Sequence, residues 1–598
     1  MILITLLLAV QDVKPPEGKA TERMKITKLA DMPTHSYPIT KKPSELVLDR
    51  TAVLALAAAI EKDINADLTK YEIADKTLLK TLYRTLASFA WYRGDATAAR
   101  ANSEKVGSLE DKPAEKMMNG LVMLSMLEAE PGANFHKSLQ AKLTARLNAL
   151  PWATVQDNIK QRKAQSEILS RNLVLGSVEA QLDKAASQGA LSQALASAVV
   201  GSAVALEKII PAKDDLTVAY SAVVTAHKTE AKADIWAARD VQLGMKEKLT
   251  PVNVAIWDSG TDVTLFPGQL WTGADKSNGI AWTLHSDKTT GALQPLEGKK
   301  EDLDQAKSNL KGFEDLQANV DSDDASAVKK RLSELPREGV QPFLENLGQF
   351  GNYSHGTHVA GITARGNPAA RLMVARITFD YHLQPELPTI EQAQKDAKAT
   401  EQTVAFFTKN NVRAANMSWG GALLEVDRAL EKNHAGGTPD ERRALAKKIF
   451  GIGYDSLKTA LSKAKDTLFV VAAGNSDNDV EFDQVLPSSF KLPNVIVVCA
   501  VDQAGDQTSF TSFGNIDVCA DGFEVESVIP GGDKVKFSGT SMAAPQVTNL
   551  AAKLWALHPK LTVAQVKDFI VRGSDEKKVG DKSIRLVNAK AALALAAK

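Results

Sequence analysis

From Val252 onward, the sequence alternates short apolar runs with longer stretches of helical periodicity. The apolar runs are 252–257, 372–377, 412–417, 468–473 and 495–500. A short continuous apolar run is typical of a strand buried on both faces, and strands that alternate with helices indicate a parallel sheet. We therefore expect an α/β fold here, with a parallel sheet flanked by helices.

Four polar residues lie where such a fold brings together the ends of its strands and the starts of its helices. One apolar run ends in Asp258, and another is followed by Asn475. His355 opens an expected helix, and Ser541 lies in the first turn of an apolar helix expected at about 541–557. Because the carboxyl ends of parallel strands meet at one edge of an open sheet, we expect these side chains to converge there.

Hydrolysis of an amide requires a nucleophile, a base and a group that orients the base, and these roles suit Ser541, His355 and Asp258. A serine in the first turn of a helix lies at the positive end of the helix dipole, beside backbone N–H groups without intrahelical partners. Histidine titrates near neutral pH and can take the serine proton, while an aspartate orients the imidazole and stabilises its cation. For the Gly-Thr-Ser segment alone, an N-cap serine on a core helix is the competing interpretation.

Four motifs carry these residues in order. They read D-S-G-T-D at 258–262, H-G-T-H-V-A-G at 355–361, A-A-G-N at 472–475 and G-T-S-M-A-A-P at 539–545. Together they resemble the subtilisin-like serine proteases, or subtilases, over about residues 235–598. The resemblance implies a subtilisin-like fold and a serine endopeptidase with an acyl-enzyme intermediate. It implies that Asp258, His355 and Ser541 form the catalytic triad. The Asn475 side chain and the Ser541 backbone N–H would then hold the oxyanion.

The segment 415–421, A-N-M-S-W-G-G, resembles the S-x-G-G segment of the same family. The resemblance implies that Ser418, Trp419 and Gly420 bind the substrate, which adds as a strand to their backbone. Trp419 takes a position often held by leucine, and it either reshapes the cleft or only packs. His358 matches the family's non-catalytic second histidine and is expected to be structural.

The first 234 residues have no part in this resemblance. Residues 1–11 are apolar like the core of a signal peptide, which favours export to an extracellular or periplasmic location over a cytoplasmic one. Residues 12–43 carry five prolines and are expected to be a linker or arm. Residues 44–234 have the spacing of helical hairpins, which predicts an all-α domain that is regulatory or propeptide-like. Family propeptides are shorter and mixed α/β, so we favour a retained domain.

Two helical insertions interrupt the expected peptidase domain. The first, 300–349, lies between Asp258 and His355, which are 97 positions apart. We expect it to form a surface hairpin that restricts access to the cleft. The second, 423–466, contains a helix start at Thr438, where a proline follows and a capping box is present.

Composition narrows the partners. Lys and Arg together number 72, and so do Asp and Glu. This balance of charge argues against nucleic-acid binding. A peptide or protein remains the expected substrate. Without a metal-ligand motif or a phosphate loop, we assign no metal site and expect the chemistry to require no cofactor. Subtilases often bind structural calcium, but its ligands are not matched here. Ala190–Ile210 is apolar, yet its polar residues favour a packed helix over a membrane span.

Cys499 and Cys519 are the two cysteines of the chain, and each ends an apparent core strand. They would pair if these strands were neighbours. Because a lone buried cysteine behaves as a small apolar residue, we expect two buried free thiols.

Two other functions are compatible with the same motifs. Capture of the acyl-enzyme by an amine would make the chain a peptide ligase or cyclase. A non-catalytic binding protein would keep the fold and hold a partner with the helical domain. The intact set of Asp258, His355, Asn475 and Ser541 favours the endopeptidase.

Overall fold

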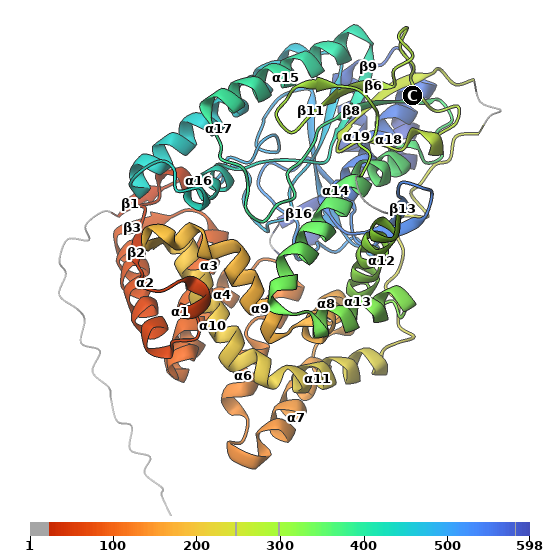
Figure 1. Ribbon diagram of the computed structural model, residues 1–598. Coiled ribbons are helices and arrows are strands. Elements are labelled where there is room, and N and C mark those ends of the chain that lie inside the picture. Colours follow the sequence, from red (N-terminus) through yellow and green to blue (C-terminus); the bar gives the residue numbers. More distant parts are fainter. Residues whose placement is uncertain (1–22, 245–247, 297–299, 581) are drawn as a thin grey trace, which may run out of the picture.

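The computed structural model describes residues 23–244, 248–296, 300–580 and 582–598. The expected signal segment, 1–11, and the beginning of the expected arm lie outside these residues. In Figure 1 the helical N-terminal region, coloured red to yellow, lies below the sheet and its covering helices.

A ten-stranded sheet forms the centre of the C-terminal part of the chain. The five apolar runs form its strands β5 (Val252–Asp258), β8 (Ala370–Arg376), β9 (Val412–Met417), β10 (Leu468–Ala472) and β11 (Val495–Val501). The other strands are β6 (Gly279–Trp282), β7 (Lys288–Thr289), β12 (Val518–Asp521), β15 (Asp575–Val579) and β16 (Lys582–Leu586). The order is β15-β16-β12-β11-β10-β9-β5-β8-β6-β7. All neighbours from β16 to β6 are parallel, and only the edge strands β15 and β7 are antiparallel, so the predicted parallel sheet is confirmed.

Helices cover both faces of this sheet (Figure 1). They are α14 (Val340–Ala364), α15 (Ile390–Lys409), α17 (Pro439–Lys463), α18 (Thr540–Leu557), α19 (Val563–Arg572) and α20 (Ala589–Ala596). The short helix α16 (Leu423–Lys432) packs on α17. Alternate residues of a strand point to opposite faces. Accordingly, Val254 packs with α18 and α19, whereas Trp257 packs with α15 and α17. Ile256 shares its face with Val254 and packs against α14.

Cys499 and Cys519 form a disulfide, so the expectation of two free thiols is wrong. The two residues are directly paired in the register of the parallel strands β11 and β12. Their Cα atoms lie 4.4 Å apart, and both side chains belong to the same core. The pairing depends on the adjacency of these strands, a tertiary feature that the two cysteine positions do not reveal.

The N-terminal region is mainly helical, as predicted. Its helices are α1 (Pro43–Leu46), α2 (Arg50–Lys70), α3 (Lys76–Arg93), α4 (Ala96–Leu109), α5 (Pro113–Met118), α6 (Leu121–Glu128), α7 (Phe135–Asn148), α8 (Trp152–Ile168), α9 (Arg171–Val178), α10 (Gln193–Val204) and α11 (Lys213–Ala226). Local signals delimit them. The Asp75 side chain accepts a hydrogen bond from Leu78 N at the start of α3, and Gly94 ends that helix at φ 90°, which favours glycine.

The described part of the expected arm is held in place by strand pairing. β1 (Met24–Ile26) pairs with β3 (Tyr71–Ile73), and β2 (Ser36–Pro38) pairs with β4 (Ala190–Ser192). The helical region therefore includes two small sheets that its helical periodicity did not predict. Short extended segments such as these give no periodic signal of their own.

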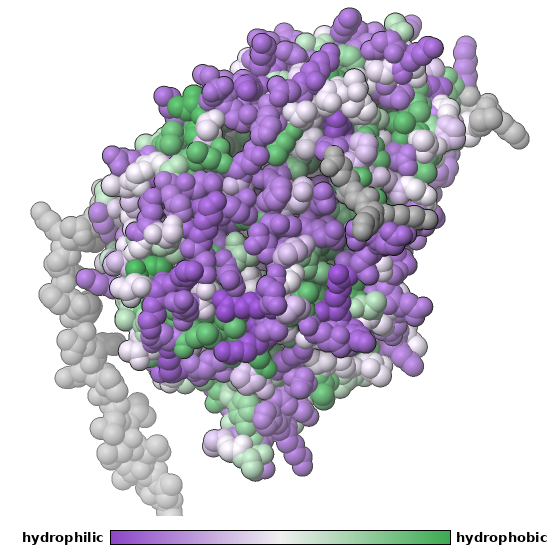
Figure 2. All heavy atoms as spheres, in the orientation of Figure 1, coloured by the Kyte–Doolittle hydropathy of each residue, from purple (hydrophilic) through white to green (hydrophobic). Residues whose placement is uncertain are grey.

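One stretch of the described residues, Gln193–Ala226, is long and apolar enough to cross a membrane by length and composition. This criterion is minimal, because the core helix of a soluble protein also meets it. Within α10, Val199, Val200 and Ala203 are buried among the other helices of the region. On the face drawn in Figure 2, hydrophilic residues dominate and hydrophobic residues form small separate patches.

The first insertion forms the hairpin of α12 (Lys300–Gln317) and α13 (Asp323–Glu334). Its apolar side does not face solvent. Val328 and Leu332 lie in a cluster that Ile168 and Leu173 of the N-terminal region also join. The hairpin therefore bridges the two parts of the chain, with a second small hairpin, β13 (Val525–Val528) and β14 (Lys534–Phe537), beside it.

The helix that carries His355 begins earlier than predicted. α14 starts at Val340, so His355 lies in its interior and the first insertion ends within this helix. Phe343, Leu347 and Phe350 follow one another at helical spacing, and they pack against neighbouring cores. In the second insertion, α17 starts after Thr438 with the predicted proline and capping box.

Candidate active site

Asp258 and His355 form a close pair at the carboxyl end of β5. The His355 Nδ1 atom lies 2.7 Å from Asp258 Oδ1, and the backbone N–H of Ser259 donates to the same oxygen at 2.7 Å. The Asp258 side chain is 1% exposed, whereas that of His355 is 28% exposed. The imidazole therefore has a buried carboxylate on one side and an edge that remains accessible to a ligand.

Burial of the imidazole lowers the pKa of His355, but the negative charge of Asp258 and its hydrogen bond raise it by more. The net pKa lies above its ordinary value of 6.5. An adjacent carboxylate stabilises the imidazolium, which is the form that exists after the ring has taken a proton. The pair can therefore accept a proton and hold the resulting charge.

Ser541 lies in the first turn of α18, as predicted. Its hydroxyl donates a hydrogen bond to the Ser418 carbonyl at 3.1 Å, and the Ser418 hydroxyl donates to the Ser541 carbonyl at 2.9 Å. Among the described hydrogen bonds, none joins Ser541 to His355. A rotation about the Cα–Cβ bond redirects a serine hydroxyl, and catalytic hydrogen bonds often align only in complexes with substrate.

Asn475 follows β10 and contacts the start of the serine helix. Its Oδ1 atom accepts hydrogen bonds from the backbone N–H of Thr540 at 2.9 Å and from the Thr540 hydroxyl at 3.0 Å. These two donors orient the amide, so that its NH2 group is directed away from Thr540. Sequence reasoning missed this role of Thr540, although the residue stands in the G-T-S motif beside Ser541.

The segment 418–421 lies beside the serine as expected, but Trp419 packs into the core. Its ring contacts Trp257 edge to face, with centroids 5.2 Å apart. Gly421 exchanges backbone hydrogen bonds of 3.0 and 2.9 Å with Leu486, and a Cβ atom on Gly420 would lie 2.8 Å from the Leu486 carbonyl oxygen. Packing, the second interpretation of Trp419, matches these contacts.

His358 lies apart from the proposed chemistry. Its Nε2 atom is 3.0 Å from the Val535 carbonyl, and its ring stacks on Phe537 with centroids 4.4 Å apart. Burial lowers its pKa to about 3, so the ring is neutral at physiological pH. These contacts match the structural role expected for it.

A cavity of about 300 Å³ lies next to the Asp–His pair. Its lining includes Ser259, which follows Asp258, and Tyr353, which precedes His355 by two residues. Phe379 and Tyr381 complete an aromatic wall, and none of the lining residues is charged. Among the described residues, no group of three or more His, Cys, Asp or Glu side chains is arranged to hold a metal ion.

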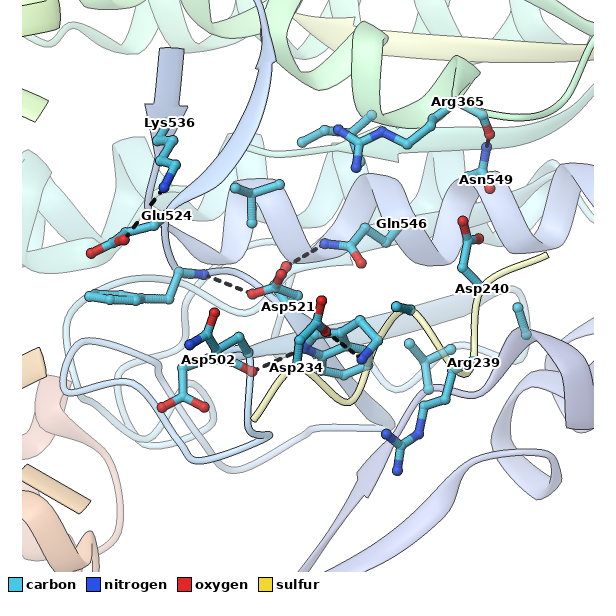
Figure 3. Close-up of a pocket in the computed structure, with 18 of the residues that line it drawn as sticks. Asp234, Arg239, Asp240, Arg365, Asp502, Asp521, Glu524, Lys536, Gln546 and Asn549 are labelled. Atoms are coloured by element: carbon cyan, nitrogen blue, oxygen red, sulfur yellow. Dashed lines mark hydrogen bonds and ion pairs between the residues drawn. The ribbon is translucent and has the colours of Figure 1, made fainter. Parts of the chain in front are cut away.

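A second pocket, of about 370 Å³, lies farther along α18 (Figure 3). Asn549 donates to the carbonyls of Thr363 and Arg365 at the end of α14, and Gln546 donates to the Asp521 carbonyl. These amides join the serine helix to the histidine helix and to β12. Burial raises the pKa of Asp521, which also lines this pocket, to about 7.

Comparison with known proteins places this chain, with its parallel α/β sheet, among the serine peptidases. The chain belongs to the subtilase family, whose model matches residues 345–586. Asp258 lies before the matched region, and the first insertion lies between Asp258 and His355. The family resemblance seen in the motifs is thereby confirmed.

Curated relatives agree with this assignment. Subtilisin from Bacillus pumilus is 33% identical over 220 residues, which cover 36% of this chain and 68% of that protein. Subtilisin E from Bacillus subtilis (strain 168) is 31% identical over 219 residues, 36% of this chain and 49% of that protein. This chain thus spans only about half the length of the latter.

Solved structures resemble this chain at lower sequence identity. A cold-adapted subtilisin-like serine proteinase is 18% identical with a TM-score of 0.34, and the match covers 59% of this chain and 94% of that one. A lanthipeptide protease is 17% identical with a TM-score of 0.37, covering 58% and 89% of the two chains.

Proposed function

We propose that this protein is a serine endopeptidase in which Ser541 is the nucleophile, His355 the general base and Asp258 the residue that orients it. His355 removes the Ser541 proton as Oγ attacks the carbonyl carbon of the scissile peptide bond. The tetrahedral intermediate collapses, the C–N bond breaks, and His355 gives its proton to the leaving amine. A water molecule, activated by His355, then hydrolyses the acyl-enzyme.

The oxyanion of each tetrahedral intermediate accepts hydrogen bonds from the Ser541 backbone N–H and the Asn475 side-chain amide. Donors fixed before the reaction stabilise this charge without the cost of reorienting solvent. The peptide adds as a strand along Ser418–Gly420, so that recognition depends mainly on its backbone. The proposed reaction uses side chains and water, and needs no metal or cofactor.

The observation that carries this proposal is the 2.7 Å contact between His355 Nδ1 and the buried Asp258. An unpaired carboxylate with 1% exposure would be unfavourable, and here its partner is an imidazole whose other edge is accessible. The Ser541 hydroxyl lies in the first turn of α18, a helix that packs against the helix of His355. The family assignment supports the same roles.

The test is covalent labelling by a serine-directed fluorophosphonate. The wild type should react at Ser541, and Ser541→Ala should lose both the label and peptidase activity while it remains folded. Mass spectrometry of the products of a peptide library would separate hydrolysis from transfer to an amine. Undiminished proteolysis by a clean Ser541→Ala preparation would exclude Ser541 as the nucleophile.

A further inference from the structure

Asp477 lies two residues after Asn475, at a junction between the helical region and the sheet. Two lysines of the helical region reach its carboxylate. The Nζ atom of Lys112 is 2.7 Å from Asp477 Oδ1, and that of Lys80 is 3.2 Å from Oδ2. The segment that carries the proposed oxyanion donor is therefore bound by charges from the other part of the chain.

These lysines are deeply buried. The side chains of Lys80 and Lys112 are 4% and 6% exposed, and Glu110, which pairs with Lys80 at 2.9 Å, is 2% exposed. Buried charges persist only when they are paired and hydrogen-bonded, and the loss of one partner leaves an uncompensated charge. The three side chains and Asp477 thus form a cluster whose members depend on one another.

The helical region also holds the backbone of this segment. The Thr77 hydroxyl donates to the Asp477 carbonyl at 2.9 Å. Lys112 Nζ donates to the carbonyls of Ser509 at 2.8 Å and Thr511 at 2.9 Å. The segment around Thr511 is itself joined to the segment 474–478, which carries Asn475 and is called the oxyanion segment below. The joining contact is the hydrogen bond that Ser512 N donates to the Gly474 carbonyl at 3.0 Å.

Asn475 is thus fixed from two directions. Thr540 orients its amide from the serine helix, and Asp477 anchors its backbone to the helical region. An oxyanion donor contributes only when it is held close to its productive position, and a displacement of about 1 Å can cost about 10²-fold in rate.

We propose that the helical region is a permanent part of the active site, in which Lys80 and Lys112 act through Asp477 to position Asn475. The two lysines and Asp477 are positioning residues, because none of them contacts the reacting atoms. This inference rests on the proposed function and adds to it an obligatory role for the N-terminal region. The competing view is that the cluster only attaches the two parts of the chain to each other.

A matched control separates these views. Lys232 is also 4% exposed, and it joins Asp157 of the helical region to Asp502 of the sheet region. Its recorded partners lie outside the segment 474–478. Lys80→Met and Lys232→Met therefore each remove one buried cation between the two parts of the chain. Only Lys80→Met removes a contact to the segment 474–478.

The experiment measures kcat and KM on a chromogenic peptide, the inhibition constant of a peptide boronate, and the melting temperature. We expect Lys80→Met to lower kcat by about 10- to 100-fold and to leave KM nearly unchanged. The inhibition constant of the boronate should rise by a factor similar to the loss in kcat. Lys232→Met should lower the melting temperature comparably and leave kcat within about twofold. Thr77→Val removes only the hydroxyl that binds the Asp477 carbonyl, and it should also lower kcat. This variant replaces Lys80→Met in the experiment if Lys80→Met does not fold.

The decisive readout is the same substitution in an Asn475→Ala background. If Lys80 acts through Asn475, its removal should cost almost nothing further in kcat there, because effects of residues that act as a unit are not additive. An equal loss in both backgrounds, or an unchanged kcat for Lys80→Met and Thr77→Val, would overturn the inference. A wild type that is neither labelled nor active would instead overturn the proposed function.

Discussion

At the scale of single residues, the hydrogen bond between Asp258 and His355 determines how the site responds to pH. In the proposed mechanism, His355 must be neutral to accept the Ser541 proton, so we expect activity to be lost when His355 becomes protonated. Because Asp258 raises the pKa of His355 above its ordinary value of 6.5, this loss occurs at a higher pH than for a free imidazole.

We therefore expect kcat/KM to fall as pH decreases, with a midpoint above 6.5. In Asp258→Asn, the carboxylate charge is gone, so turnover should drop by about 10⁴-fold and the midpoint of the residual activity should move to lower pH. The measurement is the pH dependence of kcat/KM for a small peptide. A wild-type midpoint at or below 6.5, or a midpoint that does not move in Asp258→Asn, would contradict the assignment.

At the scale of elements, the α12–α13 hairpin has a clear packing role. The expectation that it restricts access to the cleft is not tested by its contacts, but those contacts make it a bridge to the N-terminal helices. The Nζ atom of Lys329 in α13 lies 2.9 Å from Oε1 of Glu167 in α8. Leu332 is 2% exposed in the apolar cluster that it shares with Ile168 of the N-terminal region.

Leu332→Ala should reduce the free energy of unfolding by about 2–5 kcal/mol, because it leaves a cavity in that cluster. Lys330, exposed on the same helix, provides the control, and Lys330→Ala should change stability by less than about 0.5 kcal/mol. Urea denaturation of both variants measures the difference. Equal stability of the two variants would mean that the hairpin is a free surface element.

At the scale of the whole molecule, the contacts between the two parts of the chain bear on whether the N-terminal region is removed. The stretch 226–234 is where a propeptide would be cut. Within it, the Lys232 side chain is buried between Asp157 and Asp502. Ile235, the first residue after the stretch, donates its N–H to the Gln503 carbonyl at 3.0 Å. Most residues of this stretch are exposed, but these contacts fix its C-terminal end to both parts of the chain. A protease needs an extended segment that is free to enter its cleft, so the fixed end should resist cleavage.

We therefore predict that the active enzyme keeps the helical region. Wild type and Ser541→Ala, incubated side by side, should both remain uncut near residue 230 by intact mass and N-terminal sequencing. Quantitative cleavage there in the wild type alone would identify the region as a self-removed propeptide, and would contradict its proposed role in positioning Asn475.

The amino-acid sequence by itself determined the five central strands, the helix that begins at the G-T-S motif and the capped start of α17. Each of these signals is carried by residues close together in the chain, because strand burial, helix periodicity and capping depend on near neighbours. The four motifs also identified the chemical groups of the candidate site, since each motif joins a reactive side chain to the local structure that presents it.

Only the tertiary structure decided which distant residues meet. The pairing of Cys499 with Cys519 follows from the order of the strands. The packing of Trp419 on Trp257 follows from the pairing of β9 with β5, because Trp257 lies in β5 and Trp419 follows β9. The two lysines on Asp477 follow from the docking of an entire helical region. Such contacts join residues far apart in the chain, and their free energy comes from burial and charge pairing that no local pattern encodes.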